Sequence, residues 1–227
     1  MSDTPAHGIQ AEAHQGLAIG GPAEVGFDKR SLDHVPGSTL RGALASVWVR
    51  DHGPPTAGNP RRDEFIDIFE RTVRFGPLFQ DGTALVPLSA VFCKYPRTAG
   101  CRSWSIDAAV DPGAHLCPHC GQGVETGKGQ LTGVRTQRTL RAGLDERGVP
   151  KDGYLFARHE LSRGTTYRGR LVGHHPWLAE ERTIWLGGKT STNGMATVRI
   201  DTEPAPVPVP DSPREDGRWS SGAPAPP

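Results

Sequence analysis

The run that begins at Pro36 constrains the fold more than any other stretch of this chain. Pro36-Gly37 is a turn signal, and Ser38 or Thr39 is a suitable N-cap, so a helix should begin at this point. Large apolar side chains then recur at helical spacing, at Leu40, Leu44, Val47 and Trp48. The run therefore predicts a helix that packs one apolar face against a core.

The start of the predicted helix also has the composition of an anion-binding site. The first turn of a helix leaves backbone N–H groups without intrahelical partners, and these groups suit a phosphate. The hydroxyl groups of Ser38 and Thr39 and the guanidinium group of Arg41 accompany them here. An ordinary capped core helix without a ligand is the alternative interpretation.

Residues 32–45 read Leu-Asp-His-Val-Pro-Gly-Ser-Thr-Leu-Arg-Gly-Ala-Leu-Ala. This run resembles the signature of the RAMP superfamily, the repeat-associated subunits of type III CRISPR effector complexes, and looks most like the large RAMP subunit of subtype III-D. The resemblance implies an α+β fold, ferredoxin-like and RRM-type, with insertions. It also implies a subunit of an antiviral complex that holds the guide RNA (crRNA) beside other subunits, with Gly37, Ser38, Thr39 and Arg41 on the RNA.

RNA cleavage is an alternative role within the same family. Backbone RAMP subunits cut target RNA with a loop aspartate located just before the signature helix, and Asp28 and Asp33 lie in that region here. No histidine pair is spaced as the base and acid of a metal-free ribonuclease. The closer resemblance is to a binding subunit, so RNA binding is preferred to an endoribonuclease that cuts target or precursor RNA.

A glycine-rich run lies between two expected strands, at 183–186 and 196–200. Gly187 and Gly188 allow a backbone to approach a phosphate closely, and Lys189 and Ser191 supply donors. The run is not a P-loop, because the Gly-x-x-x-x-Gly-Lys-Ser/Thr pattern is absent. It resembles the glycine-rich loop of the RAMP superfamily, although Ala196 stands where the last glycine is expected. We expect this loop to lie beside the signature turn; a flexible hairpin loop is the alternative.

Basic residues are concentrated in the C-terminal half. Residues 131–199 hold 12 Lys and Arg against 6 Asp and Glu, although the net charge of the whole chain is only +1. Segments 154–161 and 165–173 predict a β-hairpin in which aromatic residues alternate with Arg158, Arg168 and Arg170. Arginines beside aromatics on strands suit single-stranded RNA, through phosphate pairing and base stacking. A solvated sheet face is the alternative.

All the cysteines of the chain, Cys93, Cys101, Cys117 and Cys120, lie within 28 residues. Cys117-Pro-His-Cys120 has the spacing of a zinc knuckle, and Gly121 follows where the chain must turn under the metal. Four thiolates complete the tetrahedral shell of a structural Zn²⁺. The spacing predicts a zinc site in an insert at 93–130; His115 or His119 in place of Cys93 or Cys101, or four free thiols, are the alternatives.

Composition predicts a modest core with many loops, because hydrophobic residues make up 35% of the chain and Gly and Pro number 29 and 21. We expect a flexible N-terminus at 1–15, a RAMP domain at 16–200 with the cysteine insert, and a disordered, acidic, Pro-rich tail at 201–227. A short helix at 63–71, an edge strand at 72–76 and a strand at 84–92 should follow the signature helix.

The N-terminus is polar and no apolar run approaches 18 residues, so we expect a cytoplasmic protein with no membrane contact. A reducing compartment also favours metal binding over disulfides. A zinc-stapled protein interaction domain unrelated to RNA is a third possible function. It would share the cysteine insert but not the signature run or the glycine loop.

Overall fold

The structure is a computed structural model that describes residues 4–20, 28–85, 88–95, 101, 105–109, 113, 115–126, 131–188 and 193–204. The chain forms two compact units. Among the described residues, the first unit combines residues 4–82 with residues 134–204, and the second unit lies within residues 83–133. Among the described residues, no helix is long and apolar enough to cross a membrane.

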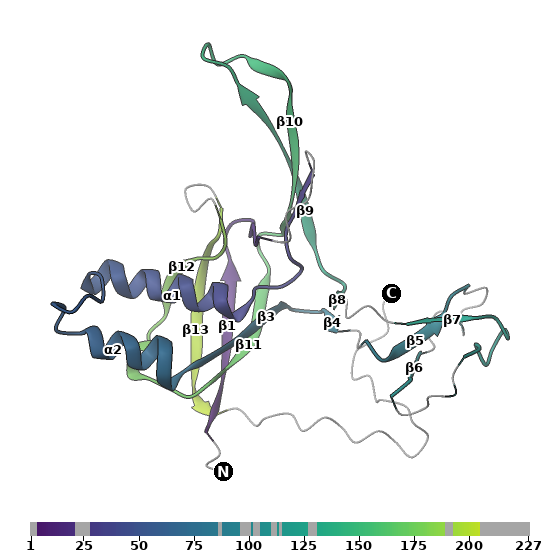
Figure 1. Cartoon of the computed structure of the whole chain (residues 1–227), viewed down its shortest axis with the longest axis horizontal. Helices are drawn as coiled ribbons and strands as arrows, with labels where there is room; N and C mark the ends of the chain where they lie inside the picture. The colour runs from purple at the N-terminus through teal and green to yellow at the C-terminus, as the bar shows by residue number, and fades with distance from the viewer. Residues whose placement is uncertain are drawn as a thin grey trace. The chain divides into compact units, whose positions relative to one another are not determined.

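The first unit is built on a five-stranded antiparallel sheet with strand order β12-β13-β1-β11-β3 (Figure 1). Its strands are β1 (Ala6–Ala13), β3 (Arg74–Gln80), β11 (Thr166–Val172), β12 (Arg182–Trp185) and β13 (Met195–Pro204). β12 and β13 form a hairpin around the glycine loop, and β3 is an edge strand, as the sequence predicts. The short 3₁₀ helix η2 (Pro176–Ala179) precedes β12.

The expectation of a flexible N-terminus is wrong for residues 6–13, because β1 is the middle strand of this sheet. Ile9, Ala11 and Ala13 alternate with more exposed residues and are almost completely buried. The apolar residues of β1 are mostly alanine, so the segment carries little hydrophobic signal until its neighbours cover it. The predicted boundary at residue 200 is also early, because β13 continues to Pro204; residues 205–227 lie outside the described residues.

The signature helix is confirmed as α1 (Gly37–His52), which lies with α2 (Arg62–Ile66) on one face of the sheet (Figure 1). The predicted face is buried: Leu40, Leu44, Val47 and Trp48. The N-cap is Pro36, not Ser38 or Thr39, and its carbonyl oxygen accepts from the N–H groups of Thr39 and Leu40. The helix predicted at 63–71 forms as α2, continued by a π-helical turn, η1 (Asp67–Thr72), which adds Ile68 and Phe69 to the core.

A second sheet in the first unit has strand order β2-β10-β9. It contains β2 (Asp28–Arg30), β9 (Thr136–Leu144) and β10 (Pro150–Leu161), and its β9–β10 hairpin reaches beyond the five-stranded sheet (Figure 1). The predicted hairpin between 154–161 and 165–173 is wrong, because β10 pairs with β9 and β11 pairs with β1 and β3. The intervening turn docks on the end of β1: Gly164 donates to Ala13, and Ala13 donates to Thr165. The chain therefore changes sheets at this turn.

The second unit consists of short strands. β4 (Ala84–Leu85) pairs with β8 (Leu131–Thr132), and β5 (Ala90–Cys93) lies between β6 (Ser105–Asp107) and β7 (Val124–Thr126). The strand predicted at 84–92 is thus divided between β4 and β5, with residues 86 and 87 outside the described residues. The compact unit begins at residue 83, earlier than the predicted insert at 93–130.

Candidate functional site

The four cysteines meet in the second unit. Their Sγ atoms all lie within 4.8 Å of one another, and Cys93, Cys101 and Cys117 are buried. A tetrahedral zinc–thiolate shell with bonds of about 2.3 Å has sulfur–sulfur edges of about 3.8 Å. The Cys93–Cys120 and Cys101–Cys117 sulfur pairs are 3.4 Å and 3.9 Å apart. The donor set therefore fits one closed tetrahedral site, and this group includes neither His115 nor His119.

The segment from Cys117 to Cys120 is a tight turn closed by backbone hydrogen bonds. Gly121, at a φ of 67°, donates to the carbonyl oxygen of Cys117 over 2.8 Å. Burial raises the pKa of the Cys117 thiol, but backbone N–H groups of His119 and Cys120 outweigh it and bring this pKa to about 7. Burial and the neighbouring Cys120 thiol raise the pKa of Cys93 to about 12. The backbone N–H groups of this turn thus stabilise the Cys117 thiolate, which is the form of cysteine that binds a metal.

The signature turn lies against the edge strand β3. Val35 exchanges backbone hydrogen bonds of 2.9 Å and 2.8 Å with Leu78. A Cβ atom on Gly37 would overlap the carbonyl oxygen of Phe75, so glycine is required for this close approach. Ser38 is exposed, and no side chain caps α1. The first turn of α1 therefore has no side-chain cap, and its position is fixed by β3.

The charged residues around this turn have partners within the chain. Arg41 forms an ion pair of 2.6 Å with Glu70 of η1, and about half of each side chain is exposed. Asp33 accepts a hydrogen bond of 2.9 Å from Nδ1 of His34, whose ring lies against Phe79. Asp28 lies in β2, and its side chain is outside the described residues. A phosphate bound to Arg41 has to compete with the Glu70 carboxylate.

The glycines of the loop allow its backbone to approach residues 16–18 closely. A Cβ atom on Gly187 would overlap the carbonyl oxygen of Ala18, and the Gly188 N–H donates to that same oxygen over 3.0 Å. At the other end of the loop, Gly194 donates to Gly16. Lys189 and Ser191 lie outside the described residues.

The described residues do not show the glycine loop directly beside the signature turn. The loop joins β12 and β13, whereas the turn abuts β3 at the opposite edge of the sheet. No hydrogen bond or bridge between the described residues of the two links them directly. Residues 17–20 contact the loop at Ala18 and the segment before the turn at Ser31 and Leu32. The sequence did not indicate that residues 17–20 contact both segments.

Arg158 belongs to a buried polar cluster at the base of the β9–β10 hairpin. Its guanidinium group lies 4.0 Å from the carboxylate of Glu160, which is only 2% exposed. Glu160 accepts a short hydrogen bond from Asn193, at the end of the glycine loop, and longer ones from Gln137 and Thr139. Arg141 donates to Asn193 over 3.4 Å. The cluster therefore joins the glycine loop to two arginines of the second sheet.

Arg168 and Arg170 lie elsewhere, on β11. They alternate with the buried residues Tyr167 and Leu171, so they occupy the sheet face opposite the helices. Arg168 forms an ion pair of 2.9 Å with Asp81. The predicted arginine track is therefore divided between two sheets, with Arg158 on one and Arg168 and Arg170 on the other.

The sequence matches no known family model and none of the curated proteins. The structure is similar to a chain of the type III-B Cmr-beta in its apo state, with a TM-score of 0.53, 13% identity, and coverage of 89% of this chain and 99% of that chain. It is also similar to a chain of the type III-B Cmr-beta bound to cognate target RNA (TM-score 0.52, 13% identity, 86% of this chain and 96% of that chain). The chain shares the fold of these Cmr-beta chains. At this identity the likeness concerns the fold alone, so the RAMP resemblance of the signature run is confirmed at that level.

Sequence reasoning missed two parts of this fold. Glu160 and Asn193 are polar residues of a kind that is usually exposed, and only their burial reveals the cluster. The β9–β10 hairpin also exposes large apolar side chains, which are 51–62% exposed: Leu140, Leu144, Val149 and Tyr154. The alternation of exposure along β9 places Arg138 on the same face as Leu140 and Leu144. The residue pattern with a period of two at 136–144 was the sequence signal that could have predicted strand β9.

Proposed function

We propose that this chain is a crRNA-binding RAMP subunit of a type III CRISPR antiviral effector complex, with subtype III-D the closest by its signature run. The fold likeness to chains of type III-B Cmr-beta, one of them bound to cognate target RNA, supports this role. The other subunits of such a complex and the guide RNA are then its partners, and the cytoplasm is the expected compartment.

The strand order supports a ferredoxin-like, RRM-type core for the first unit. The core strands in chain order are β1, β3, β11 and β13. Across the sheet they lie in the order β13-β1-β11-β3, which is 4-1-3-2 by chain order, and all neighbouring pairs are antiparallel. α1 follows the first of these strands, and η2 precedes the last. In this core β12 is an added edge strand beside the fourth strand.

The observation that carries the RNA-binding proposal is the cluster at the base of the β9–β10 hairpin. Asn193 links the glycine loop to Glu160, and Arg158 and Arg141 lie beside these two residues. Two cationic side chains, which can pair with phosphates, are thereby positioned next to the glycine loop. Lys189 and Ser191 of the loop, the signature turn with Arg41, and Arg168 and Arg170 are the proposed extensions of this surface.

Replacement of both arginines at the cluster should weaken RNA binding. We expect R141Q/R158Q to lower the affinity for repeat-derived single-stranded RNA about tenfold or more at about 0.15 M salt. The slope of log affinity against log salt should fall by about 1.4, because each phosphate that loses its arginine partner accounts for about 0.7. The measurement is a salt series of equilibrium binding, with thermal unfolding to verify that each variant is folded.

Arg62→Gln is the matched control, because Arg62 is an exposed arginine of α2. It should leave both the affinity and the salt slope unchanged. The proposal fails if folded R141Q/R158Q binds RNA with the affinity and salt dependence of the parent.

A specific contact favours endoribonuclease activity as the second candidate function. Asp33 holds Nδ1 of His34 over 2.9 Å in the loop before α1, so Nε2 can act as a base toward a ribose 2′-hydroxyl. Attack of that oxygen on the adjacent phosphorus would break the bond to the 5′ oxygen, which takes up a proton from water as it leaves. If the chain cleaves RNA in this way, Asp33→Asn and His34→Gln should each lower the rate about 100-fold.

The assay is cleavage of an RNA complementary to the guide by the assembled complex. A 2′-deoxy substitution at the scissile nucleotide should block the reaction while binding is retained. Cleavage that persists in both variants, or that tolerates the deoxy substitution, would rule out this mechanism.

A further inference from the structure

β13 extends beyond the strand that pairs with its outer side. β12 begins only at Arg182, opposite Val198, whereas β13 continues past this pair to Pro204. On its inner side β13 remains paired with β1, at Ile200 and again at Pro204. Within the part of the chain that the structure describes, residues 199–203 therefore have no strand on their outer side.

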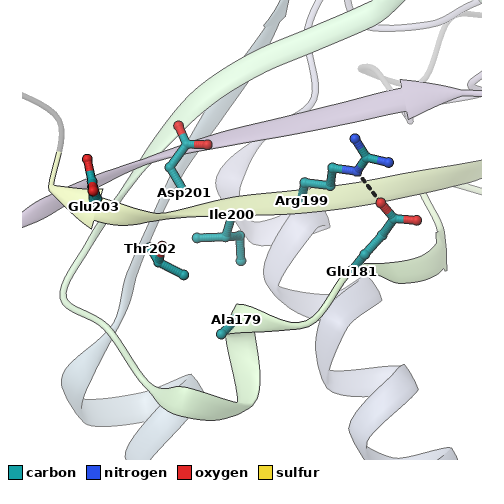
Figure 2. Close-up of a pocket in the computed structure, with 7 residues that line it drawn as sticks. All are labelled: Ala179, Glu181, Arg199, Ile200, Asp201, Thr202 and Glu203. Carbon is teal, nitrogen blue, oxygen red and sulfur yellow. Dashed lines mark hydrogen bonds and ion pairs between the residues drawn. The ribbon is translucent and has the colours of Figure 1, made fainter.

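A hollow of about 630 Å³ occupies the place where the missing strand would lie (Figure 2). Its walls are Ala179 and Glu181, which precede β12, and residues 199–203 of β13. At about 3.3 Å per residue, this stretch offers an edge of about 17 Å. The hollow is thus open along a length that a short strand can occupy.

The backbone of an unpaired edge is itself a binding surface. Alternate residues of a strand direct their N–H and C=O groups to the same side, and on an open edge these groups have only water to bond. An extended peptide satisfies them by adding a strand, and its alternate side chains give specificity. Residues 199–203 include such an edge on the outer side of β13, whereas the carbonyl oxygen of Asp201 accepts a hydrogen bond of 3.0 Å from Nδ1 of His7 on β1. Their side chains indicate what kind of peptide fits.

The charges along the edge are unbalanced. Arg199 is neutralised by an ion pair with Glu181 (Figure 2). Asp201 and Glu203 are exposed, and neither carboxylate has an ion-pair partner among the described residues. Both point to the same side of β13, whereas Ile200 and Thr202 point toward Ala179 (Figure 2). The edge thus has an acidic face and a face of neutral, partly apolar residues.

We propose that the β13 edge binds an extended segment of a partner protein as an added strand. Lysine or arginine at alternate positions of that segment would lie opposite Asp201 and Glu203, and small apolar residues between them would face Ile200, Thr202 and Ala179. RNA does not fit this hollow, because two unpaired carboxylates repel phosphate. The inference is independent of the RNA-binding function proposed above.

A second copy of this chain is a poorer occupant. Symmetric pairing of two β13 edges brings like carboxylates close together, which is destabilising. Charged residues on an edge strand are a common means of preventing such self-pairing. The occupant is therefore a different, basic segment.

The probe is a capped peptide of about six residues that alternates lysine and valine, titrated into the full chain. We expect saturable binding, with slower amide hydrogen exchange at residues 199–203. A backbone N-methylated version of the peptide should bind at least tenfold more weakly, because it cannot donate to the edge. D201N/E203Q should weaken binding of the parent peptide by a similar factor.

E146Q/D152N is the matched control, since it removes two exposed carboxylates from the β9–β10 hairpin. It should bind the peptide like the parent. No binding, equal affinity for the N-methylated peptide, or protection confined to other residues would each overturn the proposal. Concentration-dependent self-association that D201N/E203Q alters would identify a second copy as the occupant and would also overturn it.

Discussion

We propose that the four cysteines hold one structural zinc ion, whose removal should unfold the second unit and leave the first unit folded. Apart from Ala90 and Val91, the buried apolar side chains described in the second unit are three of the cysteines themselves. Strands of two to four residues around so small a cluster do not supply a stable core. Structural zinc contributes an apparent binding free energy of about 10–16 kcal/mol in small metal-dependent domains. We therefore expect about one equivalent of zinc per chain.

Hydrogen exchange with and without a chelator provides the measurement. Protection should disappear in β5 and β7 and persist in β1, β11 and α1. Cys117→Ser should reproduce the effect of the chelator, because the closed shell then lacks one thiolate. His115→Ala is the control, since His115 is not in the sulfur cluster. Full protection from hydrogen exchange in β5 of a zinc-free chain would contradict a structural role for zinc. Loss of zinc in His115→Ala would implicate a histidine ligand.

Gly37→Ala should destabilise the first unit, although alanine is the better helix former. The added Cβ would overlap the carbonyl oxygen of Phe75, and the backbone fixes the positions of both atoms. Relief requires α1 to move away from β3, which would break the hydrogen bonds between Val35 and Leu78. Overpacking of this kind typically costs about 1–3 kcal/mol, and we expect the upper end because neither partner can rotate away.

Gly42→Ala is the matched control within the same helix. Gly42 is exposed, and a Cβ atom there meets nothing within 4 Å. This substitution should stabilise the chain by about 0.5–1 kcal/mol through helix propensity. Denaturant unfolding of both variants gives the comparison. Equal effects of the two substitutions on stability would show that the contact with β3 does not require glycine at position 37.

The two glycine predictions bear on how the signature run is interpreted. Gly37 is explained by a contact within the chain, and Gly187 is explained in the same way by its approach to Ala18. A glycine in a run that suits a phosphate can therefore be required by the fold alone. The RNA-binding proposal consequently rests on the arginines beside Glu160 and Asn193, and not on the glycines.

Features governed by local spacing could be predicted from the sequence. The position and buried face of α1 follow from a turn signal and a 3.6-residue period, and the hairpin of β12 and β13 follows from two short apolar runs around glycines. The meeting of Cys93, Cys101, Cys117 and Cys120 follows from their number and spacing. In each case the residues that determine the structure are close together along the chain.

Features governed by distant pairing were decided only by the tertiary structure. β1 is the middle strand although its apolar residues are mostly alanine, because β11 and β13 cover both of its edges. The turn after β10 resembles a hairpin turn, but hydrogen bonds to Ala13 direct β11 into the other sheet. Glu160 and Asn193 are 33 residues apart and meet because two sheets converge at the glycine loop. A strand pattern specifies which face is buried, whereas the choice of neighbour depends on contacts that no local period encodes.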